Sequence, residues 1–155
     1  LRPGHTSTIR RVEGGMLSYH ADMTAENNPF ELGLDRLVDL DMEADFIGKA
    51  ALRSIQQSGV KQRQVGLILN GAALSGPNTA YWPLRAGDQV VGRITSAVYS
   101  PRLEQNIALA MVADDYSVLG TQLEADLSNE VREVTVVEKP FFDPKKAIAA
   151  STQPA

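Results

Sequence analysis

The chain has 155 residues, a net charge of -4 at pH 7 and no cysteine. Its length suits one ordinary domain, or a small domain with part of another, and allows a core without disulfides or metal. The lack of cysteine excludes a thiol nucleophile and a thiolate metal site, and it favours a cytoplasmic location. Interspersed charges and the absence of a long apolar run predict neither nucleic acid nor a membrane as partner.

The first predicted element is a short helix. The chain opens on Leu1 and a loop-like stretch, which we interpret as an entry from a longer polypeptide. Residues 9–13 are compatible with a helix that takes its N-cap from residues 6–8 and ends at Gly14 and Gly15. Residues 16–24 then alternate weakly, as a strand would.

The clearest helix pattern follows Asp45, which is suited to cap it, and ends at Ser58 and Gly59. Before it, residues 34–40 fit either a helical face or a strand, and both remain open. Lys49 follows a glycine, but the earlier glycine of a phosphate-binding loop is missing. We therefore expect Lys49 to be a solvated helix residue.

The pattern of residues changes after Lys61. Short β-branched or alternating runs are separated by Gly, Asp, Asn and Pro, with "RAGDQ" and "LSNEV" as hairpin turns. Such antiparallel strands without intervening helices predict a small barrel or sandwich. We expect Trp82 on a loop and packed on the core. Apolar residues expected on the inward faces of strands are Val65, Leu67, Leu69, Val90, Ile94, Ile107, Leu109 and Met111.

Glu13 is out of place at the end of the first helix, because the helix dipole disfavours a carboxylate there. One explanation is an ion pair with Arg10 on the same helix side. The other is a planar donor pair, such as a guanidinium or the amino-pyrimidine edge of a pterin, with Tyr19 and Asp22 beside it. His5 and His20 are too far apart, and too poor in neighbouring ligands, to predict a metal site.

Six ordered motifs resemble the C-terminal part of the glycine-cleavage T-protein family. They are "RRVEGGMLSYHADMTAENNPFELGL", "DFIGKAAL", "RQVGLILNG", "VVGRITSAVYSPRLEQNIALAMV", "GTQLEA" and "KPFFDPKK". The family contains tetrahydrofolate-dependent aminomethyltransferases, the C-terminal halves of dimethylglycine and sarcosine dehydrogenases, and dimethylsulfoniopropionate demethylases. The resemblance implies an α/β segment of a folate-binding domain over residues 1–60, a small antiparallel β-barrel over residues 61–140, and a partly disordered tail over residues 141–155.

The resemblance also implies a cofactor, tetrahydrofolate, and residues that bind it. Glu13 matches the family's pterin-binding glutamate in an Arg-x-Glu-x-Gly motif, and Tyr19 and Asp22 match a Tyr-x-x-Asp step that lines and braces the site. Arg63 either meets the acidic tail of the folate or braces the barrel. The family's catalytic aspartate lies upstream of the matched residues, so no catalytic residue is expected in this chain.

The implied function is transfer of a methyl or aminomethyl group from a small-molecule donor to tetrahydrofolate, with the upstream part of the same polypeptide completing the enzyme. His20 stands where T-proteins of glycine cleavage usually have glycine, and "SAVYSP" is closer to the demethylase-like branch. The alternative is a non-catalytic folate-binding or structural barrel that closes a site built elsewhere. An iron-sulfur assembly factor of the same fold is disfavoured, because its diagnostic cysteine is absent.

Overall fold

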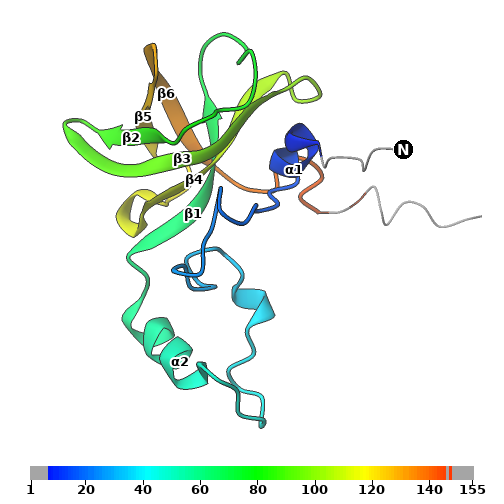
Figure 1. Ribbon diagram of the computed structural model, residues 1–155, viewed down its shortest axis with the longest axis vertical. Coiled ribbons are helices and arrows are strands. Elements are labelled where there is room, and N and C mark those ends of the chain that lie inside the picture. The colour runs from blue at the N-terminus through cyan, green and yellow to red at the C-terminus, as the bar shows by residue number, and fades with distance from the viewer. Residues whose placement is uncertain (1–6, 146, 148–155) are drawn as a thin grey trace, which may run out of the picture.

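Figure 1 shows a computed structural model in which a β-barrel follows a long and mostly irregular N-terminal segment. The structure describes residues 7–145 and residue 147. His5, the N-cap candidate Thr6 and most of the predicted tail lie outside the described residues. Within the described part of the chain, no helix is both long and apolar enough to cross a membrane.

The barrel consists of six antiparallel strands in the closed order β1-β4-β3-β2-β5-β6. Their bounds are β1 Gln62–Leu69, β2 Trp82–Ala86, β3 Gln89–Ser100, β4 Gln105–Ala113, β5 Gln122–Leu127 and β6 Glu130–Val137. A short 3-10 helix, η2 (Asp114–Tyr116), follows β4. The two predicted hairpins are confirmed, since β2–β3 and β5–β6 turn within "RAGDQ" and "LSNEV". Closure leaves the sheet without a free edge, and it decides for the barrel over the sandwich.

The two faces of β4 pack against different partners. Small side chains, Ala108, Ala110 and Val112, point into the barrel and join its interior cluster. Ile107 and Leu109 are also fully buried, but they lie on the outer face against the N-terminal helix. Their predicted inward orientation was therefore wrong, because alternation along a strand shows two faces but not which one is inside.

The other predicted core residues are mostly confirmed as buried. Val65, Leu67, Leu69 and Ile94 belong to the interior cluster. Met111 is buried, but it is not part of that cluster, so its predicted inward orientation is not confirmed. Val90 is a correction, because it lies near the β2–β3 turn with 55% of its surface exposed. Trp82 is also a correction: it begins strand β2 instead of lying on a loop, although it does pack on the interior cluster.

The N-terminal segment contains helices but, among its described residues, no named strand. Its elements are α1 (Thr8–Glu13), the 3-10 helix η1 (Asp35–Leu37) and α2 (Lys49–Ser58). The stretch predicted as a strand forms only an isolated bridge between Tyr19 and Met23. The α/β character expected for residues 1–60 is therefore not found here, because no neighbouring strand offers the ladder that would extend this bridge.

Helix α2 begins three residues later than an N-cap at Asp45 predicts, and it lies away from the barrel in Figure 1. Gly48 precedes it with a left-handed φ of 95°, a conformation suited to glycine. Asp45 therefore does not cap the helix. Lys49 is buried and not solvated, since its Nζ donates to the carbonyl oxygens of Met42 (2.5 Å) and Ala44 (3.0 Å). Its stem and charge close the loop that leads into α2.

Candidate functional site

The buried carboxylate of Asp22 ties the N-terminal segment to the barrel. Its Oδ2 accepts from Arg11 Nη1 at 2.5 Å and from the Ser18 N–H at 2.9 Å. Its Oδ1 accepts from the hydroxyls of Thr95 (2.6 Å) and Ser96 (2.7 Å) on β3. Two donors on each oxygen use the lone pairs that a carboxylate offers. Asp22 thus acts as a brace, with no acceptor position left for a ligand.

A β-bulge brings both hydroxyls of β3 to Asp22. Ile94 pairs with Ala110 and Ser96 with Leu109, so Thr95 is an extra residue in the ladder. Because a bulge interrupts strict alternation, neighbouring side chains reach the same partner. Ser96 also accepts from Arg11 Nη2 at 2.8 Å, which closes a ring of hydrogen bonds. This role was not predicted from the sequence, although two adjacent polar residues in an apolar strand were the available signal.

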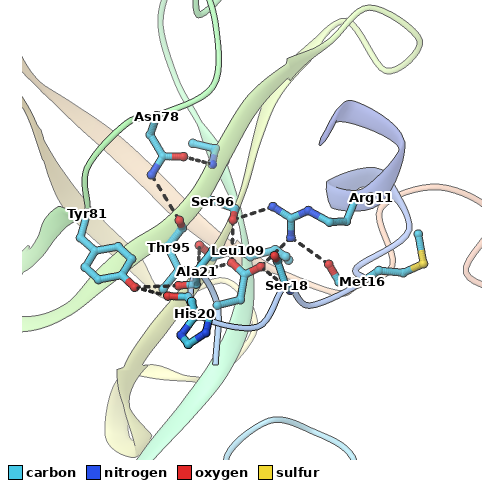
Figure 2. Close-up of polar contacts among 12 residues, drawn as sticks. Arg11, Met16, Ser18, His20, Ala21, Asn78, Tyr81, Thr95, Ser96 and Leu109 are labelled. Atoms are coloured by element: carbon cyan, nitrogen blue, oxygen red, sulfur yellow. Dashed lines mark hydrogen bonds and ion pairs between the residues drawn. The ribbon is translucent and has the colours of Figure 1, made fainter. Parts of the chain in front are cut away.

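A second contact holds the loop that carries Asp22. His20 has a φ of 71°, in the left-handed region where glycine is free of strain. Its N–H donates to the carbonyl of Met23 at 2.8 Å. The Tyr81 hydroxyl lies 2.9 Å from the carbonyl oxygen of His20 and 3.0 Å from that of Ala21, and it donates its hydrogen to this pair (Figure 2). These contacts explain how a histidine is accommodated where a glycine would suit the backbone.

Glu13 ends α1 and is buried, with 4% of its surface exposed. Its Oε1 accepts from the Ser100 hydroxyl at 2.5 Å, and Ser100 Oγ in turn accepts the Leu103 N–H at 3.2 Å. Its Oε2 lies 3.9 Å from Arg102 Nη1, which is too long for a hydrogen bond. The cation facing Glu13 is therefore Arg102 from the β3–β4 turn. The predicted partner Arg10 makes none of the described ion pairs.

The surroundings of Glu13 come from three parts of the chain. The Arg102 guanidinium stacks over the Phe142 ring, with 4.2 Å to the ring centroid. The Phe142 N–H donates to the Glu13 carbonyl oxygen at 3.1 Å. One carboxylate oxygen of Glu13 thus has a hydrogen bond and the other has only a distant cation. This leaves acceptor capacity beside a flat aromatic and guanidinium surface.

Neither Tyr19 nor Arg63 contributes a described hydrogen bond to the carboxylate of Asp22. Tyr19 is 53% exposed and meets His20 edge-on, with 4.4 Å between ring centroids. Arg63 Nε donates to Asp114 Oδ1 at 2.8 Å, and both side chains are 40% exposed. Two roles were left open for Arg63, contact with the acidic tail of the folate and bracing of the barrel. The ion pair with Asp114 corresponds to bracing. A role of either residue in cofactor binding stays a prediction.

The family model of the glycine cleavage T-protein C-terminal barrel domain matches residues 62–143, which is more than half of the chain. The chain belongs to this family. The matched range contains all six strands and the turn that carries Arg102. The family predicted from the six motifs is therefore confirmed, as is its barrel.

Relatives of this T-protein family member carry two kinds of name. An aminomethyltransferase of Synechococcus sp. (strain CC9902) is 41% identical over 132 residues, which cover 85% of this chain and 35% of that protein. A dimethylsulfoniopropionate demethylase of Ruegeria pomeroyi is 38% identical over 138 residues, which cover 89% of this chain and 37% of that protein. Both names denote enzymes, and the two identities are too close to single out one activity.

A solved structure has the same fold. The aminomethyltransferase T of the glycine cleavage system from Bartonella henselae matches with a TM-score of 0.78 and 24% identity, over 88% of this chain and 38% of that one. The chain thus spans little more than a third of the length of the relatives that it matches.

Proposed function

We propose that the chain is the C-terminal portion of a cytoplasmic enzyme that transfers a methyl or aminomethyl group from a small-molecule donor to tetrahydrofolate. The family and the names of its relatives support this class of enzyme. The match covers only 35% of the aminomethyltransferase, which supports a longer polypeptide for this chain as well. In our proposal the catalytic aspartate lies in the part of that polypeptide upstream of the matched residues.

The observation that carries the proposal is that only one of the two carboxylate oxygens of Glu13 has a described hydrogen bond. Ser100 fixes one of its oxygens at 2.5 Å, while the other has no hydrogen bond among the described residues. The amino-pyrimidine edge of a pterin presents adjacent N–H donors, and a fixed carboxylate binds such a pair strongly because its charge assists both hydrogen bonds. The residues present therefore fit the pterin ring of tetrahydrofolate.

In this proposal the chain orients the cofactor and does not move a proton. When bound, tetrahydrofolate supplies the nitrogen that accepts the one-carbon group. Glu13 fixes the pterin, and the Asp22 brace holds α1, and with it Glu13, against β3 and β4. Such alignment lowers the barrier by removing the entropy of bringing donor and acceptor together.

A structural role is the second candidate, and it is favoured by how the barrel is filled. Its interior is packed with apolar side chains from all six strands. The Asp22 carboxylate is saturated by groups of the chain itself. On this alternative the barrel closes a site built elsewhere and binds no folate of its own.

Titration of tetrahydrofolate into the complete native polypeptide, wild type against Glu13→Ala, tests the proposal. Loss of a charged hydrogen bond should weaken binding about tenfold or more. Glu26→Ala is the control, because Glu26 is exposed and its carboxylate makes none of the described hydrogen bonds. Circular dichroism checks that each variant is folded. Equal affinities for wild type and a folded Glu13→Ala variant would favour the structural alternative.

A further inference from the structure

A cleft of about 650 Å³ lies beside the end of α1. Its walls are the residues that follow α1, the segment before and into η1, and the residues that follow β6. The lining is mostly apolar and includes Met16, Leu17, Met23, Leu32 and Leu34. Neither Glu13 nor Asp22 is among the lining residues.

Lys139 spans this cleft between two glycine turns. Its Cβ is 3.6 Å from the position that a Cβ on Gly15 would take, and its Nζ is 3.9 Å from that position on Gly33. Both glycines have left-handed φ values, 63° and 68°. The two turns therefore let the stem of Lys139 pass between them and bring its ammonium to the wall of the cleft.

The ammonium of Lys139 is short of partners. None of the described hydrogen bonds or ion pairs involves its side chain, and the carboxylate of Asp22 is already filled by four donors. Burial lowers the pKa of Lys139 to about 8, and the negative charge of Asp22 raises it only in part. A partly desolvated cation without a hydrogen-bond acceptor costs free energy that a bound anion would recover.

A second cation, Arg36 of η1, lines the same cleft. It is exposed, and its side chain likewise makes none of the described hydrogen bonds or ion pairs. The cleft thus combines an apolar wall with two cations that have no described hydrogen-bonded counter-ion, and it has no lining carboxylate. Such a lining favours a small molecule with an apolar body and an anionic end.

We propose that this cleft binds the carboxylate of a small molecule, with Lys139 as its counter-ion and Arg36 at the entrance. Two sources of that carboxylate are compatible with the proposed function. The choice of these two sources rests on that proposed function. One is the glutamyl end of tetrahydrofolate, and the other is a methyl donor that itself carries a carboxylate.

Binding to the complete native polypeptide tests this site, with wild type, Lys139→Met, Lys139→Arg and Lys61→Met compared. The probes are tetrahydrofolate, its analogue tetrahydropteroate, which lacks the glutamyl group, and propionate as a minimal carboxylate. Lys61 is a matched control, since it is exposed and loses the same charge outside this cleft.

We expect Lys139→Met to weaken one of the carboxylate probes about tenfold or more, as loss of a charged hydrogen bond does. Lys139→Arg and Lys61→Met should bind as wild type does. Weakened tetrahydrofolate with unchanged tetrahydropteroate identifies the glutamyl end. Weakened propionate with unchanged tetrahydrofolate identifies the donor.

The pH dependence provides a readout that a merely structural lysine would not change. Binding of the affected probe to wild type should weaken about tenfold between pH 7 and pH 9, because the charged fraction of a group with a pKa of about 8 falls by that factor. Lys139→Arg should bind evenly over this range. Equal binding by wild type and Lys139→Met, or an equal loss in Lys61→Met, overturns the proposal. Lys139-dependent propionate binding without any tetrahydrofolate binding would overturn the proposed function and leave this site standing.

Discussion

Replacement of Asp22 by asparagine should undo the brace between α1 and the barrel. The amide group has one acceptor oxygen, so one of the two donor pairs must face its NH₂. The Oδ1 side adapts better: Thr95 lies 3.0 Å from the Leu109 carbonyl oxygen and can turn its hydrogen there. Ser96 adapts less well, because it already accepts from Arg11.

The expected cost follows from the charge that is left behind. Arg11 would lose its carboxylate with only 15% of its side chain exposed, while the side chain of Asp22 is fully buried. Breaking a buried pair by removing one partner costs about 3 to 5 kcal/mol. Asp126→Asn is the control, because the Arg85–Asp126 pair has side chains 38% and 32% exposed and such exposed pairs contribute little to stability.

Urea unfolding followed by circular dichroism measures this difference as a change in the free energy of unfolding. Since proteins open locally as well as globally, hydrogen exchange of the α1 amides provides the local measurement. We expect Asp22→Asn to lose several kcal/mol in one or both assays and Asp126→Asn to remain close to wild type. The same small effect in both variants, with α1 protection unchanged, would refute the role of Asp22 as a brace.

Two further predictions concern packing and pH. A Cβ added at Gly92 would lie 2.3 Å from the Met111 carbonyl oxygen, so the free energy of unfolding of Gly92→Ala in urea should fall by about 3 kcal/mol or more. Gly76→Ala is the control and should be near neutral, because a Cβ added there has no atom within 4 Å. Equal effects of the two substitutions would contradict this explanation. Between pH 8 and about 10.4 the unfolded chain keeps the proton of Lys139 while the native chain releases it, so stability should rise with pH by about 3 kcal/mol across that window. Lys139→Met should remove this rise, and pH-dependent unfolding that is identical in wild type and variant would contradict it.

The sequence was sufficient to predict features that are formed by residues close together along the chain. The turns of "RAGDQ" and "LSNEV" carry residues suited to reverse the chain between alternating runs, so both hairpins were predictable. The end of α2 at Ser58 and Gly59 was predictable for the same reason, because Gly59 has a left-handed φ of 79°. The ordered motifs likewise sufficed to predict the family.

Tertiary structure decided the features that depend on residues far apart in the sequence. Alternation could not tell which face of β4 is the barrel interior, because that depends on where α1 docks on Ile107 and Leu109. By contrast, Lys49 is buried by a nearby contact, since its Nζ donates to the carbonyl oxygens of Met42 and Ala44, seven and five residues earlier in the chain. Helix propensity does not describe this contact.

The candidate site also combines features that the sequence shows with features that only the folded chain creates. The sequence by itself determined that Glu13 is an acid at an unfavourable helix position, which made it a functional candidate. Only the folded chain decided that Ser100 and Arg102 surround it and that Asp22 is saturated, since these contacts join residues 73 to 89 positions apart along the chain. Hydrogen bonds of this kind depend on the bulge in β3 and the docking of α1, and no local propensity encodes either.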